Sequence, residues 1–562
     1  MKSIIKKLGL FVGFLMTFLT SAAYDFEVEG IAYTITSLTD LTVSVDQLIK
    51  TDLTDVRVPE NVEYKNKSLK VTSISNNAFK GNEVLKTIYL PNTITSIGSS
   101  AFMGDSSLTT INIPMSVTYI GAEACSGCSS ITTVDIPSGV KQIFDKTFYG
   151  CKSLININIP SSVVSIGELA FAKSGLQSIT IPESVTSLGG STFAYTHLKS
   201  IQLPYTIDVV PAYCFYDCQD LFEVTFSSSK IDSYAFSKCT SLQQISLPEN
   251  LTTIGDMAFE GCTNLIEFSI PSEVTNIKPS ILWNCPNISK LTIGRGLDGL
   301  PVTAEDGKNE YTYKTLGGYL HKDNGGYFGT TRITKESYLQ GVKEFIIEDS
   351  DTQFRIKGFE IDGIATPPFA NMELDYYYVG RPLVDIEKWS SNSILFTSEI
   401  KQGSGRILKL EINGNCTFVP YFYQKIDTLK LGANITEFNL KNIYKEDIAK
   451  IECLSETPPT CTYASYSNFP TKVYTDAILC VPLGCKEAYA NAEVWKNFWN
   501  IYEVDSKSGI TEISNDNDDV IYHVYNITGL LIGESYSLEE IKQLPKGIYI
   551  LVNKFKKYKI KI

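Results

Sequence analysis

The sequence predicts a leucine-rich-repeat solenoid (a repeat horseshoe or superhelix, mostly β with short helical turns), followed by a small C-terminal β-sandwich-like module. Two observations carry the solenoid prediction. A phrase of the type "IPSSVVSIGELAF" occurs in eight versions with a period near 22 residues, and each unit holds an L-x-x-L-x-L core. This period and this core are typical of leucine-rich repeats. Because one unit cannot bury its apolar side alone, the units must stack.

The N-terminus, "MKSIIKKLGLFVGFLMTFLTSAAYDF", has the build of a secretory signal peptide over residues 1–23. It combines a basic head, an apolar run from Leu8 to Leu19 and small residues before Tyr24. The apolar run is too short to span a bilayer comfortably, and no longer run follows, so we expect no transmembrane segment. The sequence therefore predicts an exported protein, either secreted or held at the cell surface.

The net charge argues against one class of partner. The 562-residue chain has a formal charge of −13, and removal of Lys2, Lys6 and Lys7 with the signal peptide gives −13 − 3 = −16. A chain this acidic is a poor phosphate binder, so we expect no nucleic-acid partner.

Residues 24–75 are expected to form an N-terminal cap and the first repeat, and residues 76–290 the regular repeats of 22 to 23 residues. In one unit the core is Leu154, Ile157 and Ile159, and its period-2 alternation predicts a half-buried strand. A proline then ends the strand. The apolar residues that start successive units are Leu90, Ile113, Ile136, Ile159, Ile181, Leu203, Phe226, Leu247 and Ile270.

The positions between these apolar residues must point outward and form polar columns along the solenoid. Such columns suit a flat surface that binds protein or glycan through many weak contacts, but they equally suit a solvated sheet face, because hot-spot residues such as Trp, Tyr and Arg are nearly absent. The candidate binding residues in these columns are Asn112, Asp135, Asn158, Thr180, Gln202, Thr225, Glu223 and Glu267.

The chain has 13 cysteines, an odd number, so complete internal pairing is impossible. Six of them recur at one repeat position, where other units have Asp105, Ser174 and Thr196, which indicates a small, partly polar slot. Cys125 stands at a position that other units give to phenylalanine, so the C-x-x-C with Cys128 indicates packing more than zinc or redox chemistry. The column members are Cys128, Cys151, Cys218, Cys239, Cys262 and Cys285, and we expect Cys151 to be unpaired and buried.

No catalytic, metal-binding or cofactor-binding residues are predicted. The three histidines, His197, His321 and His523, lie far apart in the sequence, and no P-loop, dinucleotide or calcium fingerprint occurs. A site built from acids alone, as in a glycan hydrolase, stays open for residues 291–401.

The period breaks down over residues 291–457, which we interpret as degenerate repeats with insertions. Fragments such as "LTIGRGL", "FIIEDSD" and "LKLGANITEF" still have the pattern of a strand followed by a turn. Tyr376, Tyr377 and Tyr378 could form a stacking surface for sugars, but alternation places Tyr377 on the opposite face, which favours core packing.

Residues 458–504 are expected to cap the solenoid with a strand ending at Val481 and Pro482, and then a short helix. Residues 505–519 form a polar linker, and residues 520–562 a small β module whose basic final strand is an edge protected against aggregation. The aromatic residues expected in the cap are Tyr489, Trp495, Phe498 and Trp499.

Residues 24–504 resemble the BspA-like leucine-rich-repeat surface proteins of Bacteroides-type bacteria. The resemblance lies in the opening "YDFEVEGIAYTI", the units "AFxGCxSLxxIxIPxSVxxIG" and the cap "LCVPLGCKEAYANAEVWKNFWNI". The tail, "VYNITGLL…LPKGIYILV", resembles C-terminal sorting domains of the type IX secretion system. The resemblance implies a secreted or surface adhesin, possessing no catalytic residues, and attachment at the outer surface through the C-terminal module.

The sequence thus predicts an exported binding protein that recognises an extracellular protein or glycan through a repeat face. The alternatives are a passive structural surface protein and, less favoured, a glycan hydrolase in residues 291–401.

Overall fold

The computed structural model describes residues 24–278, 280–297, 342–349, 374–380, 406–413, 416, 425–440, 448–462 and 468–504. It also gives the backbone of short strands within 303–333, 354–366, 383–385 and 522–561. The chain divides into two compact units. The first comprises Met1–Leu265, Asn276–Pro286 and Leu316–Tyr319, and the second comprises Ile266–Thr275, Asn287–Thr315 and Leu320–Ile562. The predicted signal peptide and linker lie outside the described residues.

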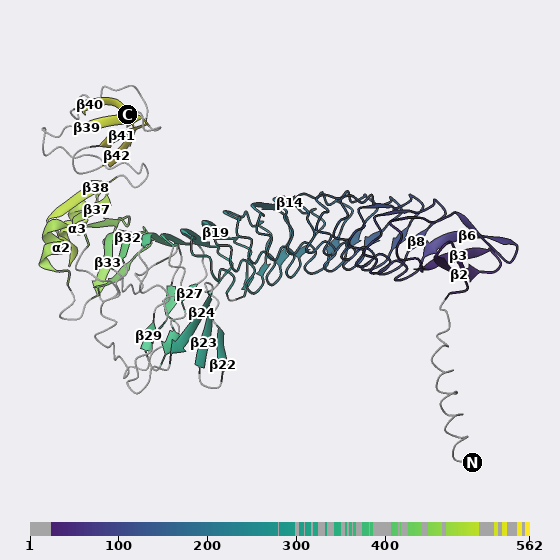
Figure 1. Cartoon of the computed structure of the whole chain (residues 1–562). Helices are drawn as coiled ribbons and strands as arrows, with labels where there is room; N and C mark the ends of the chain where they lie inside the picture. Colours follow the sequence, from purple (N-terminus) through teal and green to yellow (C-terminus); the bar gives the residue numbers. More distant parts are fainter. Residues whose placement is uncertain are drawn as a thin grey trace, which may run out of the picture. The chain divides into compact units, whose positions relative to one another are not determined.

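The first unit is a stack of coils, and each coil contributes a turn and one or two short strands (Figure 1). The first strands and isolated bridges of the coils pair in parallel and form one side, which we call the first-strand side. The second strands pair in parallel on another side, the second-strand side. The first strands are β4 (Asp55–Arg57), β7 (Thr87–Tyr89), β9 (Thr110–Asn112), β14 (Ser200–Gln202) and β16 (Glu223–Thr225). The second strands are β8 (Ser96–Ile97), β10 (Tyr119–Ile120), β11 (Gln142–Ile143), β12 (Ser165–Ile166), β13 (Ser187–Leu188), β15 (Val209–Val210), β17 (Lys230–Ile231), β18 (Thr253–Ile254) and β20 (Asn276–Ile277).

The third side of each coil, the turn side, consists of residues 99–105 and their equivalents in the other repeats. Its backbone groups bond from one coil to the next, as in Phe102 N–H to Ala124 O (2.8 Å) and Gly104 N–H to Ser126 O (2.7 Å). Each turn contains two residues with positive φ, for example Ser100 (55°) and Gly104 (81°). These two positions recur with the period of the sequence repeat, so the turn has one conformation throughout the stack.

The core of the first unit is built from columns of equivalent side chains. A buried phenylalanine from most turns stacks on the next, with Cys125 in its place in one repeat, and ring centroids lie 5.6 Å apart for Phe148 and Phe171 and 5.8 Å for Phe171 and Phe193. Phe215, Phe236 and Phe259 continue the column. Leucine and isoleucine columns from the L-x-x-L-x-L cores fill the rest, as the stacking argument predicts.

The N-terminal end is closed by an antiparallel meander whose third strand pairs in parallel with β6, which continues into the second-strand ladder. Tyr33 in this cap is buried, and Phe26 stacks on Tyr64 with ring centroids 4.2 Å apart. The strands of the cap are β1 (Phe26–Val28), β2 (Ile31–Ser37), β3 (Thr42–Leu48), β5 (Asn61–Tyr64) and β6 (Lys67–Ile74).

The second unit is centred on a nine-stranded sheet in which all neighbouring strands are parallel. Three of these strands lie in the fragments that the sequence suggested, and Tyr377 is buried while Tyr376 and Tyr378 are half-buried, as alternation predicts. The strands in spatial order are β19 (Glu267–Ile270), β21 (Lys290–Ile293), β26 (Glu344–Ile347), β30 (Leu374–Val379), β32 (Arg406–Ile412), β33 (Lys425–Leu431), β35 (Lys450–Cys453), β37 (Ile478–Pro482) and β38 (Asn500–Val504).

The remaining described strands form smaller sheets. Those at the insertions are β22 (Thr303–Gly307), β23 (Glu310–Thr315), β24 (Gly318–Asp323), β25 (Arg332–Ile333), β27 (Phe354–Ile356), β28 (Phe359–Ile361), β29 (Ile364–Thr366), β31 (Leu383–Asp385), β34 (Glu437–Asn439) and β36 (Thr460–Thr462). At the C-terminus, β39 (Tyr522–Asn526), β40 (Leu531–Tyr536), β41 (Ile548–Val552) and β42 (Lys557–Lys561) form one sheet in the order β40-β39-β41-β42. The basic strand β42 is an edge strand, as the sequence predicts.

The end of the nine-stranded sheet is covered by three short helical segments. Trp495 is fully buried and its indole N–H donates to Pro459 O (2.8 Å), and the Tyr489 hydroxyl donates to Ser455 O (2.7 Å). One expectation for this region is wrong, because Trp499 is 78% exposed and directly precedes the edge strand β38 instead of entering the core. The helical segments are α2 (Thr471–Asp476), α3 (Lys486–Asn491) and η4 (Trp495–Asn497).

Candidate functional site

The predicted binding residues all lie exposed on the strands or bridges of the parallel ladders. The register pairs equivalent repeat positions, so Asp135, Asn158 and Thr180 are direct neighbours across three coils. Gln202 pairs with Thr225. The structure thus brings these short polar side chains into columns, as the period-2 pattern predicts.

The other three predicted residues are placed less compactly. Asn112 lies opposite Tyr89, and Glu223 lies opposite Ser200. Glu267 belongs to the second unit, where it lies opposite Lys290. The columns therefore offer hydroxyl, amide and carboxylate groups but little large apolar surface, so they suit weak polar contacts only.

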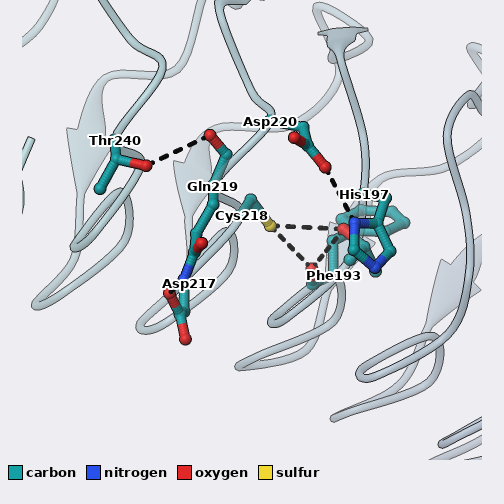
Figure 2. A network of polar contacts seen from close by, with 8 residues as sticks. Phe193, His197, Asp217, Cys218, Gln219, Asp220 and Thr240 are labelled. Atoms are coloured by element: carbon teal, nitrogen blue, oxygen red, sulfur yellow. Dashed lines mark hydrogen bonds and ion pairs between the residues drawn. The ribbon is translucent and has the colours of Figure 1, made fainter. Parts of the chain in front are cut away.

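The cysteine column is a structural feature of the turns, as Figure 2 shows for one member. The Cys218 thiol donates to Phe193 O of the preceding coil (3.0 Å), and Cys151 donates in the same way to Cys125 O (3.2 Å). Burial raises the pKa of the Cys151 thiol, and no disulfide joins any of the thirteen cysteines, all of which lie in the described part of the chain. The prediction that Cys151 is buried and unpaired is confirmed, as is the packing role of Cys125, which is 1% exposed.

Asp105 occupies the same column position but carries a carboxyl group. Its Oδ1 accepts the backbone N–H of Asn82 (2.8 Å), while its Oδ2 has no hydrogen-bond partner among the described residues. Burial raises the pKa of Asp105 from 3.8 to about 8, against the lowering effect of backbone hydrogen bonds from Asn82 and Gly81. This buried repeat position thus holds neutral, weakly polar side chains. Burial keeps the Asp105 carboxyl protonated near neutral pH.

Of the three histidines, only His197 has a side chain in the part of the chain that the structure describes. Its Nδ1 lies 2.8 Å from Asp220 Oδ2 in the next coil, and both side chains are mostly exposed (Figure 2). An exposed pair of this kind contributes little to stability. Figure 2 draws no third residue bonded to His197 or Asp220, so these two residues are not part of a catalytic triad among the residues shown there.

Sequence reasoning missed a group of large side chains on the turn side. Five tyrosines and two lysines from five consecutive turns form a continuous chain of contacts, which we call the tyrosine–lysine stripe. Its members are Tyr149, Lys173, Tyr195, Tyr213, Tyr216, Tyr234 and Lys238.

The stripe begins with a lysine held between two tyrosines. The Lys173 ammonium lies 5.4 Å from the centroid of the Tyr149 ring and 5.3 Å from that of Tyr195. These distances are within the range of cation–π attraction. Hydrogen bonding with the Tyr149 hydroxyl raises the pKa of Lys173, so this lysine is charged at physiological pH.

The stripe continues through three further rings. Tyr195 meets Tyr216 edge to face at 5.3 Å, and Tyr213 meets Tyr216 edge to face at 5.5 Å. Tyr213 and Tyr234 are stacked, with centroids 4.7 Å apart and ring planes within 5°. The Lys238 ammonium lies over the Tyr216 ring (4.9 Å) and donates to its hydroxyl (2.6 Å). Tyr195 and Tyr213 are 42% and 39% exposed, so the stripe is open to a partner.

The backbone beneath the stripe is held in an unfavourable conformation. Lys173, Tyr195 and Lys238 have φ of 58°, 60° and 62°, at the turn position that other repeats fill with glycine. Tyr213 and Tyr234 have φ of 57° and 58° at the other left-handed position. A left-handed conformation costs a non-glycine residue roughly 1–2 kcal/mol. Lys173, Tyr195 and Lys238 therefore reduce stability relative to the glycine of most other repeats, which is the behaviour expected of residues that serve binding. By contrast, the position of Tyr213 and Tyr234 carries a side chain in the other repeats as well.

The sequence does contain a signal for the stripe. Its tyrosines occur in "FYGC", "AYTH", "AYCFYDC" and "SYAFSKC", at the turn positions that flank the column cysteines or their replacements. Aligning the repeats on the turn as well as on the strand would have placed these residues on one side of the coil.

Two negative findings apply to the part of the chain that the structure describes. No cluster of three or more His, Cys, Asp or Glu side chains there could hold a metal ion. No helix there is both long and apolar enough to cross a bilayer.

The parallel ladders, the columns of leucine and isoleucine and the regular turns define a leucine-rich-repeat solenoid, which confirms the predicted fold class. Residues 72–199 and 186–304 match the model of the BspA type leucine-rich repeat region. The resemblance noted for the repeats is therefore confirmed over these residues, whereas the resemblance of the tail to sorting domains stays a prediction.

Solved structures of bacterial leucine-rich-repeat proteins are similar to this chain. A leucine-rich repeat protein from Bacteroides ovatus is 22% identical, and the match covers 79% of this chain and 100% of that one, with a TM-score of 0.43. A leucine rich cell surface protein from Faecalibacterium prausnitzii is also 22% identical and covers 50% and 92%, with a TM-score of 0.35. The pneumococcal vaccine antigen PcpA is 17% identical and covers 65% and 98%, with a TM-score of 0.40. Among curated proteins, no match was found.

Proposed function

We propose that this protein is an exported leucine-rich-repeat adhesin, secreted or held at the cell surface, that binds an extracellular protein or glycan through one side of its repeats. The observation that carries the proposal is the tyrosine–lysine stripe, because tyrosine is enriched at the energetic centres of interfaces. Three of its members, Lys173, Tyr195 and Lys238, keep their side chains at the turn position that most other repeats give to glycine, in spite of the backbone cost.

Export and attachment belong to the same proposal. Residues 1–23 act as the signal peptide, and residues 520–562 act as a module for sorting or surface attachment. The boundaries at residues 75, 290, 457 and 504 mark the N-terminal cap, the regular repeats, the degenerate repeats and the C-terminal cap. No resident metal, cofactor or catalytic residue is part of this function.

The columns of the first-strand side are a second candidate surface for the same function. Asp135 and Asn158 are exposed direct neighbours and can supply several weak polar contacts along the stack. Such contacts gain strength only when many act together. We therefore expect the columns to add to the affinity of the stripe for a long partner.

An adhesion assay with the mature full chain tests the proposal. Beads coated at high density with residues 24–562 are applied to a panel of host matrix proteins, a glycan array and intact bacteria. The stripe variant Tyr195→Ser/Tyr213→Ser is compared with the first-strand variant Asp135→Ala/Asn158→Ala. Tyr205→Ser is the matched control, because Tyr205 is 73% exposed at the turn that follows a first strand and lies outside the stripe.

We expect the wild type and the Tyr205→Ser control to adhere and the stripe variant to lose most of its adhesion. If only the first-strand variant loses adhesion, the binding site lies in the polar columns instead of the stripe, and the adhesin function is retained. If the wild-type beads are retained by nothing in the panel, a passive structural role replaces the proposal. The third hypothesis is a glycan hydrolase in residues 291–401, and most of these residues lie outside the described part of the chain.

A further inference from the structure

The way the stripe's rings are arranged favours one class of ligand. Each tyrosine ring has at least one face covered by another member of the stripe: Lys173 or Lys238 lies over three rings, and Tyr213 and Tyr234 cover each other. Sugar rings bind aromatic side chains mainly through free ring faces. Because one face of each ring is occupied, the stripe offers hydroxyl groups and ring edges alongside the faces that remain open, and tyrosine-rich protein interfaces contact protein partners in this way.

Every hydrogen-bonding group of the stripe can act as a donor. Tyrosine hydroxyls can donate, and lysine ammonium groups can only donate. Because Lys238 donates to the Tyr216 oxygen, the proton of the Tyr216 hydroxyl is directed to another acceptor. A surface rich in donors is matched best by acceptors that carry charge, above all carboxylates.

The charges around the stripe are not balanced at Lys173. Lys146 has Glu123 at 3.7 Å, and the charge of Lys238 is accompanied by Glu260 and Asp217. Within the described part of the chain, Lys173 has no carboxylate within 4 Å and rests only between two tyrosine rings. The overall negative charge of the chain acts over long range and is screened beyond about 8 Å at physiological salt, so the local positive charge decides which group docks there.

We propose that the stripe binds an acidic segment of a protein partner, with a carboxylate seated at Lys173 and further acceptors at the hydroxyls of Tyr195 and Tyr213. This inference rests on the proposed binding function and gives the stripe its ligand class. Lys173 itself is exposed, and the ring edges on either side of it favour apolar or aromatic residues next to the acid.

Peptide selection tests the ligand class directly. A phage-displayed library of random linear peptides is first depleted on the Tyr195→Ser/Tyr213→Ser chain and then selected on the wild-type mature chain. Enriched peptides are synthesised and titrated against both by fluorescence polarisation. We expect Asp and Glu beside apolar residues in the enriched peptides, and unchanged binding by the Tyr205→Ser control.

A double-mutant cycle then isolates the charged contact. We expect Lys173→Gln to weaken peptide binding by about two- to fivefold, as for an ion pair at an exposed lysine. Replacing the peptide's Asp or Glu by Asn or Gln should weaken binding to the wild type equally and have no further effect on Lys173→Gln. Tyr195→Phe and Tyr213→Phe keep the rings and remove the donors, and each should weaken binding without a change in thermal stability.

The possible outcomes separate this inference from the proposed function. Enriched peptides without acidic residues, or equal affinity of the wild type and Lys173→Gln, would overturn the acidic-ligand assignment even if adhesion depends on the stripe. Glycan binding that is lost in Tyr195→Ser/Tyr213→Ser, with no peptide enriched, would replace the protein partner by a carbohydrate. Adhesion that persists in the stripe variant would remove the stripe from the function and leave the first-strand side.

Discussion

Replacing Asp105 by asparagine should stabilise the protein at neutral pH, by an amount that grows with pH. The Asp105 carboxyl is fully buried, one of its oxygens lacks a partner among the described residues, and its pKa is raised from 3.8 to about 8. Asparagine keeps the shape and the oxygen that accepts the Asn82 N–H, but it has no proton to lose.

The pH dependence follows from the two pKa values of Asp105. Below its unfolded pKa of 3.8 the group is protonated in both states and costs nothing. As the pH rises the unfolded chain ionises first, so the folded state loses about 1.4 kcal/mol per pH unit until the folded pKa of about 8 is reached. At pH 7 the accumulated loss is about 1.4 × (7 − 3.8), or roughly 4 kcal/mol.

Urea unfolding of the mature chain and of Asp105→Asn, followed by far-UV circular dichroism between about pH 5 and pH 8, measures this difference. Hydrogen exchange of peptides covering residues 79–108 locates it, because a solenoid can open locally. Asp135→Asn is the matched control, since Asp135 is exposed and its replacement should give a small difference at every pH. A stability gain for Asp105→Asn that does not change with pH, or a loss at pH 7, would refute the reasoning.

Four further predictions concern single side chains. Phe171→Ala should cost about 3–5 kcal/mol in urea unfolding, because it leaves a cavity in the buried phenylalanine column; a loss below about 1 kcal/mol would contradict that column. Tyr489→Phe should cost about 1–3 kcal/mol, because Ser455 O loses its buried donor, and an unchanged urea midpoint would argue against this bond. Cys151 should react with a thiol reagent only after unfolding, since burial raises its pKa; rapid labelling of this residue in the native protein, mapped by peptide mass spectrometry, would show otherwise. Lys173→Gly should leave the melting temperature equal or higher, because relief of the left-handed backbone offsets the lost cation–π contacts, and a clear decrease would mean that the lysine serves stability.

The columns of the solenoid could be predicted because each follows from a local rule. Alternation within the L-x-x-L-x-L core fixes which residues of a strand are buried, and the parallel register then brings Asp135 beside Asn158. The slot of Cys151 could be predicted in the same way, because its replacements in other repeats show the size and polarity that fit. In both cases the position of a residue in one repeat predicts the burial of the equivalent residues in the other repeats.

The stripe could not be predicted by these rules, because its members differ from their equivalents in other repeats. Lys173 and Tyr195 stand where Gly104 and Gly127 stand, and a propensity argument treats such positions as turns without side chains. Trp499 shows a related difficulty at the C-terminal cap, because its large apolar ring predicts a place in the core, whereas the side chain is exposed. Sequence periodicity identifies the residues that every repeat shares, whereas the residues of the proposed binding stripe are those that differ from their equivalents in other repeats.

The turn side is well suited to such departures for a physical reason. A Cβ atom added at Gly104 would meet nothing closer than the Gly81 Cα at 3.7 Å, so a side chain there has room and only the backbone conformation opposes it. This cost stays within one turn, because each repeat contacts only its neighbours and the backbone ladder beneath is already formed. A solenoid can therefore exchange side chains on its turn side at roughly 1–2 kcal/mol each without disturbing the phenylalanine column. Replacing Tyr195 by glycine should accordingly remove its ring from the stripe and leave the stacking of Phe193 on Phe215 unchanged.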